Sequence, residues 1–167
     1  MTGEFLIRST AMLAIAGYSL RLLTDAAGSA TPGRQRTSRW FWTLGCAALL
    51  IHTACAFQFL HHWSHAAAWE YTRRRTLELT GWDSGIGLWV NYVMTAIWLI
   101  DVVGWWGSLD WPRQRIWYWT VQTLFAFLVF NATAVFGPAY WTPIVGAMVV
   151  ILVGLATFTQ GTVETES

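Results

Sequence analysis

One stretch of the chain contains all four of its histidines: His52-Thr53-Ala54-Cys55-Ala56-Phe57-Gln58-Phe59-Leu60-His61-His62-Trp63-Ser64-His65. It lies inside a longer segment that opens with Trp40 and reaches Thr80 with no proline and with Gly45 as its single glycine. Because proline and glycine are the strongest helix breakers, this segment predicts one long helix. Its first part, 40–62, is apolar enough to cross a bilayer. The more polar part, 63–80, predicts a helical extension that ends at Gly81, a residue type favoured just past helix ends.

Composition assigns the chain to the membrane proteins. Of the 167 residues, 55% are hydrophobic and 11% are charged, whereas about a quarter of the residues in a soluble domain are charged. The 13 tryptophans suit the aromatic belts at membrane surfaces. The net charge of +1 does not indicate a protein that binds nucleic acid, which would be strongly basic. Further apolar segments of spanning length occur at 5–23, 86–106, 116–136 and 142–158.

The predicted fold class is therefore all-α. We expect a polytopic membrane protein with a single integral membrane domain over 1–167, built as a bundle of about five transmembrane helices. The second helix would extend beyond the outer membrane face. The segment 24–39, which is rich in small residues and contains Pro32, is expected to be a loop.

The first apolar segment has an alternative interpretation. Residues 11–20 resemble the apolar region of a signal peptide, and Gly28-Ser29-Ala30 resembles a cleavage site. The alternatives for 5–23 are therefore a spanning helix and a signal-like anchor, and we expect the retained helix.

Arginine positions predict the orientation in the membrane, because cytoplasmic loops are enriched in positive charge. The first loop, counted with the arginine that precedes it, and the third loop together have six arginines, and the second loop has three. This difference favours an outside amino terminus and an inside carboxy terminus in a bacterial inner (cytoplasmic) membrane. The six are Arg21, Arg34, Arg36, Arg39, Arg113 and Arg115, and the three are Arg73, Arg74 and Arg75.

Polar residues inside the apolar segments fall at two predicted depths. Gln58, His61, Asn91 and Asn131 share a layer near the outer surface, and amides in such a layer often form hydrogen bonds between helices. Arg21 and Asp101 share the inner depth, where an ion pair is expected. A proton-relay carboxylate at Asp101 is the alternative.

Three histidines at the end of the second segment have the spacing of metal ligands. On a continuous helix His61, His62 and His65 fall within about 100° of arc, and His61 and His65 are an i, i+4 pair. Zinc, copper or iron would need further ligands from a loop, from Glu70 or from another chain. The alternative is a set of interfacial histidines at the headgroup boundary.

His52 lies in the middle of an apolar segment, where a neutral histidine suits an axial ligand of haem or a chlorophyll-type pigment. Phe57 and Trp98 could line such a pocket. The sequence offers no second intramembrane histidine on a facing helix, so another axial ligand would come from a partner or a different side chain. The alternative is a hydrogen bond from His52 to a neighbouring helix.

Three functions remain open at this point. The first is a small accessory or assembly subunit of a larger membrane complex, linked to electron transfer or metal handling, whose partners are the lipid bilayer and other membrane subunits or copies of itself. The second is a stand-alone metal- or haem-dependent enzyme or cytochrome. The third is a transporter or channel around Asp101. The chain contains no CxxC and no readable phosphate loop, and Cys46 and Cys55 are too far apart on one helix to form a disulfide.

Overall fold

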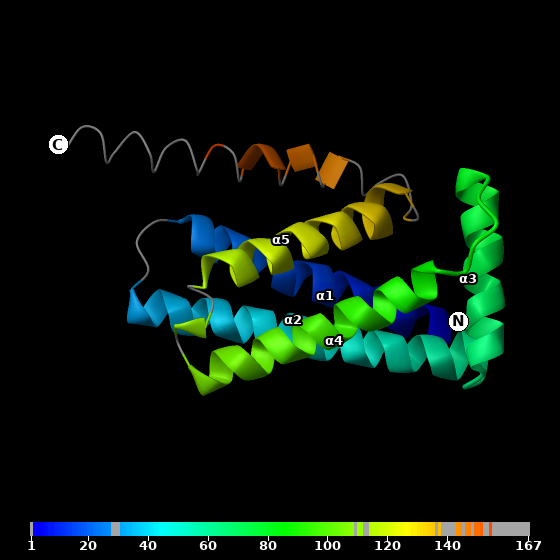
Figure 1. Cartoon of the computed structure of the whole chain (residues 1–167), viewed down its shortest axis with the longest axis horizontal. Coiled ribbons are helices and arrows are strands. Elements are labelled where there is room, and N and C mark those ends of the chain that lie inside the picture. The colour runs from blue at the N-terminus through cyan, green and yellow to red at the C-terminus, as the bar shows by residue number, and fades with distance from the viewer. Residues whose placement is uncertain are drawn as a thin grey trace.

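The computed structural model describes residues 2–27, 31–108, 110–111, 114–135, 137, 143–144, 146–147, 149–151 and 154. The elements that these residues form are all helical (Figure 1). They are α1 (Thr2–Ala26), α2 (Pro32–Ala56), η1 (Phe57–His61), α3 (His65–Thr80), α4 (Gly87–Gly107), α5 (Arg115–Phe130) and η3 (Asn131–Val135). The predicted fifth helix, 142–158, lies mostly outside the described residues.

Within the described part of the chain, α1, α2, α4 and α5 form a bundle, and α3 crosses its end (Figure 1). α1, α2, α4 and α5 run along a common direction, whereas α3 lies across the end of the bundle that contains the amino terminus (Figure 1). Among the residues that the structure describes, three helical segments are long and apolar enough to cross a membrane: Gly3–Ala26, Pro32–His61 and Gly87–Gly107. They coincide with three of the predicted spans, 5–23, 40–62 and 86–106.

α1 and α2 approach each other closely where two glycines meet. A Cβ atom built on Gly17 would lie 2.6 Å from the Cα atom of Gly45 and 2.8 Å from the carbonyl oxygen of Phe41. A Cβ atom on Gly45 would in turn lie 2.9 Å from the Trp98 ring. Small residues at a helix crossing allow this close backbone approach, which is the usual packing device of membrane helices.

An aromatic core joins α2, α4 and α5. The ring centroids of Trp42 and Trp98 are 4.5 Å apart, and Phe125 lies 4.7 Å from Trp98 and 5.1 Å from Trp42. All three side chains are buried. Tilted and edge-on ring pairs at these distances stabilise a core beyond the area they bury.

The predicted loop at 24–39 is wrong over most of its length. α1 continues to Ala26 and α2 already begins at Pro32, because Thr31 caps it by accepting a hydrogen bond from the Arg34 N–H at 3.4 Å. Proline is favoured at the first helical position because its missing N–H would have no partner there. The Thr31-Pro32 pair was therefore the signal for this earlier start.

The prediction of one long helix from 40 to 80 is also wrong. After the wide turn η1, His62 and Trp63 adopt left-handed φ values of 49° and 59°, which end the helical hydrogen-bond ladder. The Ser64 hydroxyl then accepts from the Ala67 N–H at 3.2 Å and caps a new helix. α3 is thus a separate helix and not an extension. The prediction that Gly81 ends it is confirmed, since Gly81 is the left-handed residue after Thr80.

Candidate functional site

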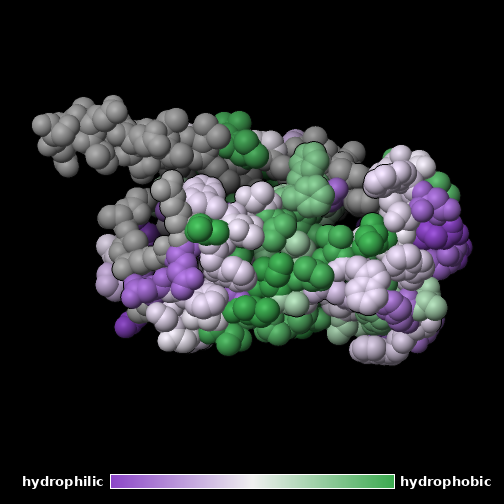
Figure 2. Space-filling model, in the orientation of Figure 1, coloured by the Kyte–Doolittle hydropathy of each residue, from purple (hydrophilic) through white to green (hydrophobic). Residues whose placement is uncertain are grey.

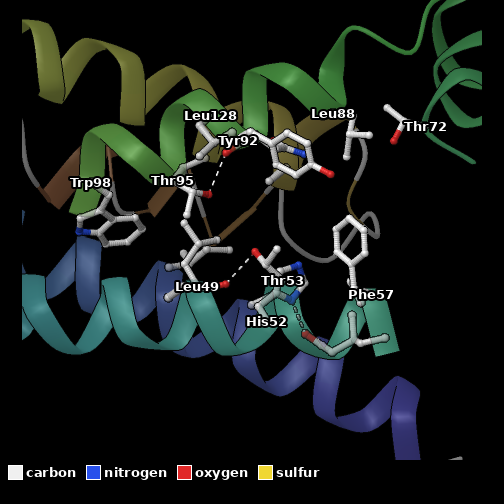
Figure 3. A pocket seen from close by; sticks show the side chains of 18 of the residues that line it. Leu49, His52, Thr53, Phe57, Thr72, Leu88, Tyr92, Thr95, Trp98 and Leu128 are labelled. Atoms are coloured by element: carbon white, nitrogen blue, oxygen red, sulfur yellow. Dashed lines mark hydrogen bonds between the residues drawn. The ribbon is translucent and has the colours of Figure 1, made fainter. Parts of the chain in front are cut away.

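A cavity of about 340 Å³ lies among α1, α2, α4 and α5, with α3 at one end (Figure 3). Its volume falls near the lower limit of ligand pockets, which span about 300–1,000 Å³. Most of the side chains that line it are apolar. The polar ones are Tyr18, His52, Thr53, His61, Tyr71, Thr72, Asn91, Tyr92 and Thr95.

His52 presents one ring nitrogen to this cavity. Its Nδ1 atom lies 2.9 Å from the carbonyl oxygen of Ile7, on α1 (Figure 3). A carbonyl oxygen can only accept, so Nδ1 is the donor, and in the neutral imidazole Nε2 then carries a lone pair. Figure 3 shows this second nitrogen on the cavity side of the ring. The bond to α1 is the hydrogen bond to a neighbouring helix that the sequence offered as the alternative to haem ligation.

Three threonine hydroxyls on the cavity wall already donate to their own helices. Thr53 donates to Leu49 at 3.0 Å and Thr95 donates to Asn91 at 2.8 Å, both to main-chain carbonyls (Figure 3). Thr72 donates in the same way to a carbonyl of α3 at 2.9 Å. Because a hydroxyl has a single proton, each of these oxygens can now only accept a further hydrogen bond.

The α3 end of the cavity is built by aromatic and histidine side chains. The His61 ring is buried and lies 5.3 Å from the ring of Tyr71 and 5.6 Å from that of Phe57. The hydroxyl oxygen of Tyr92, which also lines the cavity, lies 3.2 Å from Nδ1 of His65, so these two groups share a hydrogen bond.

The structure does not gather the three histidines into a metal site. His61 ends one helical segment and His65 begins the next, with His62 in the turn between them, so the i, i+4 geometry does not exist. Over the described ranges, no group of three histidine, cysteine, aspartate or glutamate side chains is placed to hold one ion. The physical reason is the pair of left-handed residues that interrupts the helix.

Glu70, the further ligand considered for that site, is engaged elsewhere. Its carboxylate accepts from Arg73 at 2.9 Å and lies 3.1 Å from Arg74. The hydrogen bond from Arg73 lowers the pKa of Glu70, and the charges of both arginines act in the same direction. The side chain therefore belongs to a surface ion-pair network on α3.

The structure brings Arg21 and Asp101 together at the other end of the bundle, where both are buried. Arg21 Nη1 lies 3.4 Å from Asp101 Oδ2, and the guanidinium lies 4.0 Å from the Trp42 ring centroid. The Asp101 carboxylate also accepts indole N–H donors from Trp42, Trp111 and Trp117. Sequence reasoning assigned the tryptophans to surface belts and missed these three, which no spacing rule connects to Asp101.

The amide residues predicted in one layer make local contacts. Gln58 accepts from the Trp63 indole at 2.8 Å, and Asn131 donates to the carbonyl of Phe127 on its own helix at 2.8 Å. Asn91 lines the cavity. A further amide was not singled out from the sequence: Gln122 is buried, and neither side-chain polar atom has a hydrogen-bond partner.

Comparisons with known proteins return no matching family model, no matching curated protein and no matching solved structure.

Proposed function

We propose that this chain is an integral membrane protein of the bacterial inner membrane, with its amino terminus outside and its carboxy terminus inside. Three apolar helical segments of spanning length support this proposal. Figure 2 adds that apolar residues form a band across the middle of the visible face, while hydrophilic residues gather towards both ends. That distribution suits a molecule whose middle faces lipid and whose ends face headgroups and water.

Within that setting, we propose that the protein binds a small lipophilic ligand in the cavity beside His52. The observation that carries this proposal is the His52 Nε2 atom, which faces an otherwise largely apolar cavity. Polar atoms inside a membrane domain are costly unless they are paired, and they frequently mark functional sites. A ligand that pairs with Nε2 removes this cost, while the apolar walls bind its body.

Filling the cavity tests this function. Ala56 lines the cavity, whereas Ala54, on the same helix, is exposed and does not. The purified protein, its Ala56→Phe variant and its Ala54→Phe variant would be analysed by native mass spectrometry and solvent extraction. We expect a lipophilic molecule to accompany the native protein and Ala54→Phe but not Ala56→Phe. Equal content in the two variants would contradict the proposal.

Haem is the second candidate ligand, and it is favoured by the same histidine. A hydrogen bond from Nδ1 to a carbonyl is the arrangement that orients ligating histidines and leaves Nε2 for the metal. An absorption spectrum separates the two ligands. A Soret band that disappears in His52→Leu would identify haem, and a featureless spectrum beside a co-purified lipophile would exclude it.

We also propose that the protein acts as an accessory subunit of a larger membrane complex. Support comes from the small size of the chain and from large apolar side chains exposed along α5, which are Ile116, Trp119, Phe127 and Phe130. A native gel in mild detergent should show a large assembly that contains other chains. A monodisperse monomer that keeps the ligand would argue against this role.

A further inference from the structure

We infer that the ligand of the cavity carries a hydroxyl group as a hydrogen-bond donor on an apolar, ring-containing body. This inference rests on the proposed ligand-binding function and specifies its chemical class, a lipophilic phenol or alcohol. It follows from counting which polar atoms on the cavity wall still have a proton to give.

The polar wall of the cavity consists mainly of acceptors. His52 uses its Nδ1 proton on Ile7, which leaves the Nε2 lone pair. Thr53 and Thr95 use their only protons on carbonyls of their own helices, which leaves oxygen lone pairs. A ligand hydroxyl can donate to one of these atoms, whereas an ether or a ketone of the same shape would place acceptor against acceptor.

The remaining polar residues do not reverse this preference. The Tyr92 hydroxyl and the His65 ring already share a hydrogen bond at 3.2 Å. Tyr18 also lines the cavity, but it donates its proton to the carbonyl of Gln122 and keeps only its lone pairs. Asn91, His61 and Tyr71 line the cavity as well, and an amide, a neutral imidazole and a phenol hydroxyl each offer both a donor and an acceptor. They can therefore bind a hydroxyl donor or an ether or ketone acceptor, and they do not discriminate between these two classes of ligand.

The apolar walls indicate the body of the ligand. Aromatic rings of Phe57, Trp98 and Phe125 line the cavity together with aliphatic side chains from α1, α2 and α5. Ring faces and edges bind other aromatic rings well. A volume of about 340 Å³ suits a fused ring or a short branched chain better than a whole two-chain lipid.

A matched pair of probes tests the donor requirement: 1-naphthol and 1-methoxynaphthalene, which differ by methylation of the hydroxyl. Binding to the full chain in lipid nanodiscs would be measured by equilibrium dialysis, with empty nanodiscs as the control for partitioning. We expect the native protein to bind 1-naphthol about tenfold more tightly than the ether, which is the weight of one hydrogen bond. In His52→Phe, which keeps a ring but removes the acceptor, the ratio should fall to about one.

The outcomes distinguish a failure of the donor requirement from a failure of the proposed ligand-binding function. Equal binding of both probes by the native protein would overturn the donor requirement and leave the cavity as a binding site. Binding of neither probe beyond empty nanodiscs, together with identical extracts from Ala56→Phe and Ala54→Phe, would overturn the proposed function. If His52→Phe does not fold, the double variant Thr53→Val/Thr95→Val gives a second measurement, and an unchanged native ratio in it assigns the preference to His52 alone.

Discussion

The indole nitrogen of Trp42 donates to Asp101 at 2.8 Å, a contact that joins α2 to α4 across 59 residues of sequence. Trp111 and Trp117 reach the other carboxylate oxygen at 2.9 and 2.5 Å, and Arg21 contacts the first oxygen at 3.4 Å. Both oxygens of this buried carboxylate are therefore paired with donors from other parts of the chain. The arrangement favours a structural anchor over a proton relay.

Replacing Asp101 by Asn should therefore destabilise the fold strongly. The variant removes the buried negative charge beside Arg21, whose other carboxylate contact is Asp25 at 3.5 Å. Breaking a buried ion pair typically costs about 3–5 kcal/mol. The free energy of unfolding in mixed detergent micelles would measure it. Glu4→Gln removes an exposed partner of Arg8 and is the control, with an expected change within about 0.5 kcal/mol. Equal stability of the two variants would contradict the anchor role.

The glycine crossing predicts a second destabilised variant. In Gly17→Ala the new methyl group would lie 2.6 Å from the Gly45 backbone, so α1 and α2 must separate. Overpacking of this kind typically costs about 1–3 kcal/mol. Gly33→Ala is the matched control, because no atom lies within 4 Å of its Cβ position. The same detergent unfolding assay applies, and a stable Gly17→Ala protein would show that the crossing is looser than described.

The left-handed turn predicts a variant that stabilises. His62 has a φ of 49°, where a side chain costs about 1–2 kcal/mol and glycine costs little. His62→Gly should raise the unfolding free energy by about 1 kcal/mol. His65→Gly, the same exchange in the first turn of α3, should lower it. A loss of stability in His62→Gly would mean that the imidazole makes a contact that outweighs the backbone strain.

The ion pairs of α3 predict a pH dependence. Because the pKa of Glu70 is lowered in the folded chain, its contribution to stability is present above its ordinary pKa of 4.5 and is lost as pH falls through the lower folded value. Carbon-detected NMR of the Glu70 carboxyl would follow the titration. Arg73→Gln should move the pKa back upward, and Arg8→Gln should not. No movement with Arg73→Gln would assign the shift to another cause.

The proposed orientation predicts which ends of the bundle can be labelled. Thr37 and Thr80 are both exposed and lie on α2 and α3, near opposite ends of the bundle. In a chain without Cys46 and Cys55, a membrane-impermeant thiol reagent added to intact cells should label Thr80→Cys and leave Thr37→Cys unreacted. The reverse pattern would invert the topology.

Sequence reasoning predicted five apolar helices, and α1, α2, α4 and α5 lie over four of these segments because length is a robust signal. It missed where helices begin and end inside polar stretches: Thr31-Pro32 starts α2 early, and Ser64 starts α3 after a break. Each of these capping signals involves only one or two residues, so a prediction based on the average composition of a segment overlooks it. The metal prediction at His61 and His65 inherited that error, because it assumed an unbroken helix.

The site itself was foreseen only in part. His52 was singled out for its position in an apolar segment, but its bond to Ile7 depends on how α1 and α2 cross. Likewise, Arg21 and Asp101 could be matched by depth, whereas the indoles around Asp101 come from residues whose orientation depends on packing. Depth follows from counting residues along a helix, but the direction in which a side chain points requires the tertiary structure.

The position of α3 also bears on how deep the cavity would lie in a bilayer. The helix lies across the bundle end, and exposed tryptophans flank it on both sides, Trp63 before Ser64 and Trp82 after Gly81. In a bilayer such rings settle at headgroup level, so α3 would float in the surface plane. His52 precedes His61 by nine positions, so in that placement its ring would lie about 14 Å below the surface. Any molecule seated beside His52 would then have its polar atom at a constant height in the membrane.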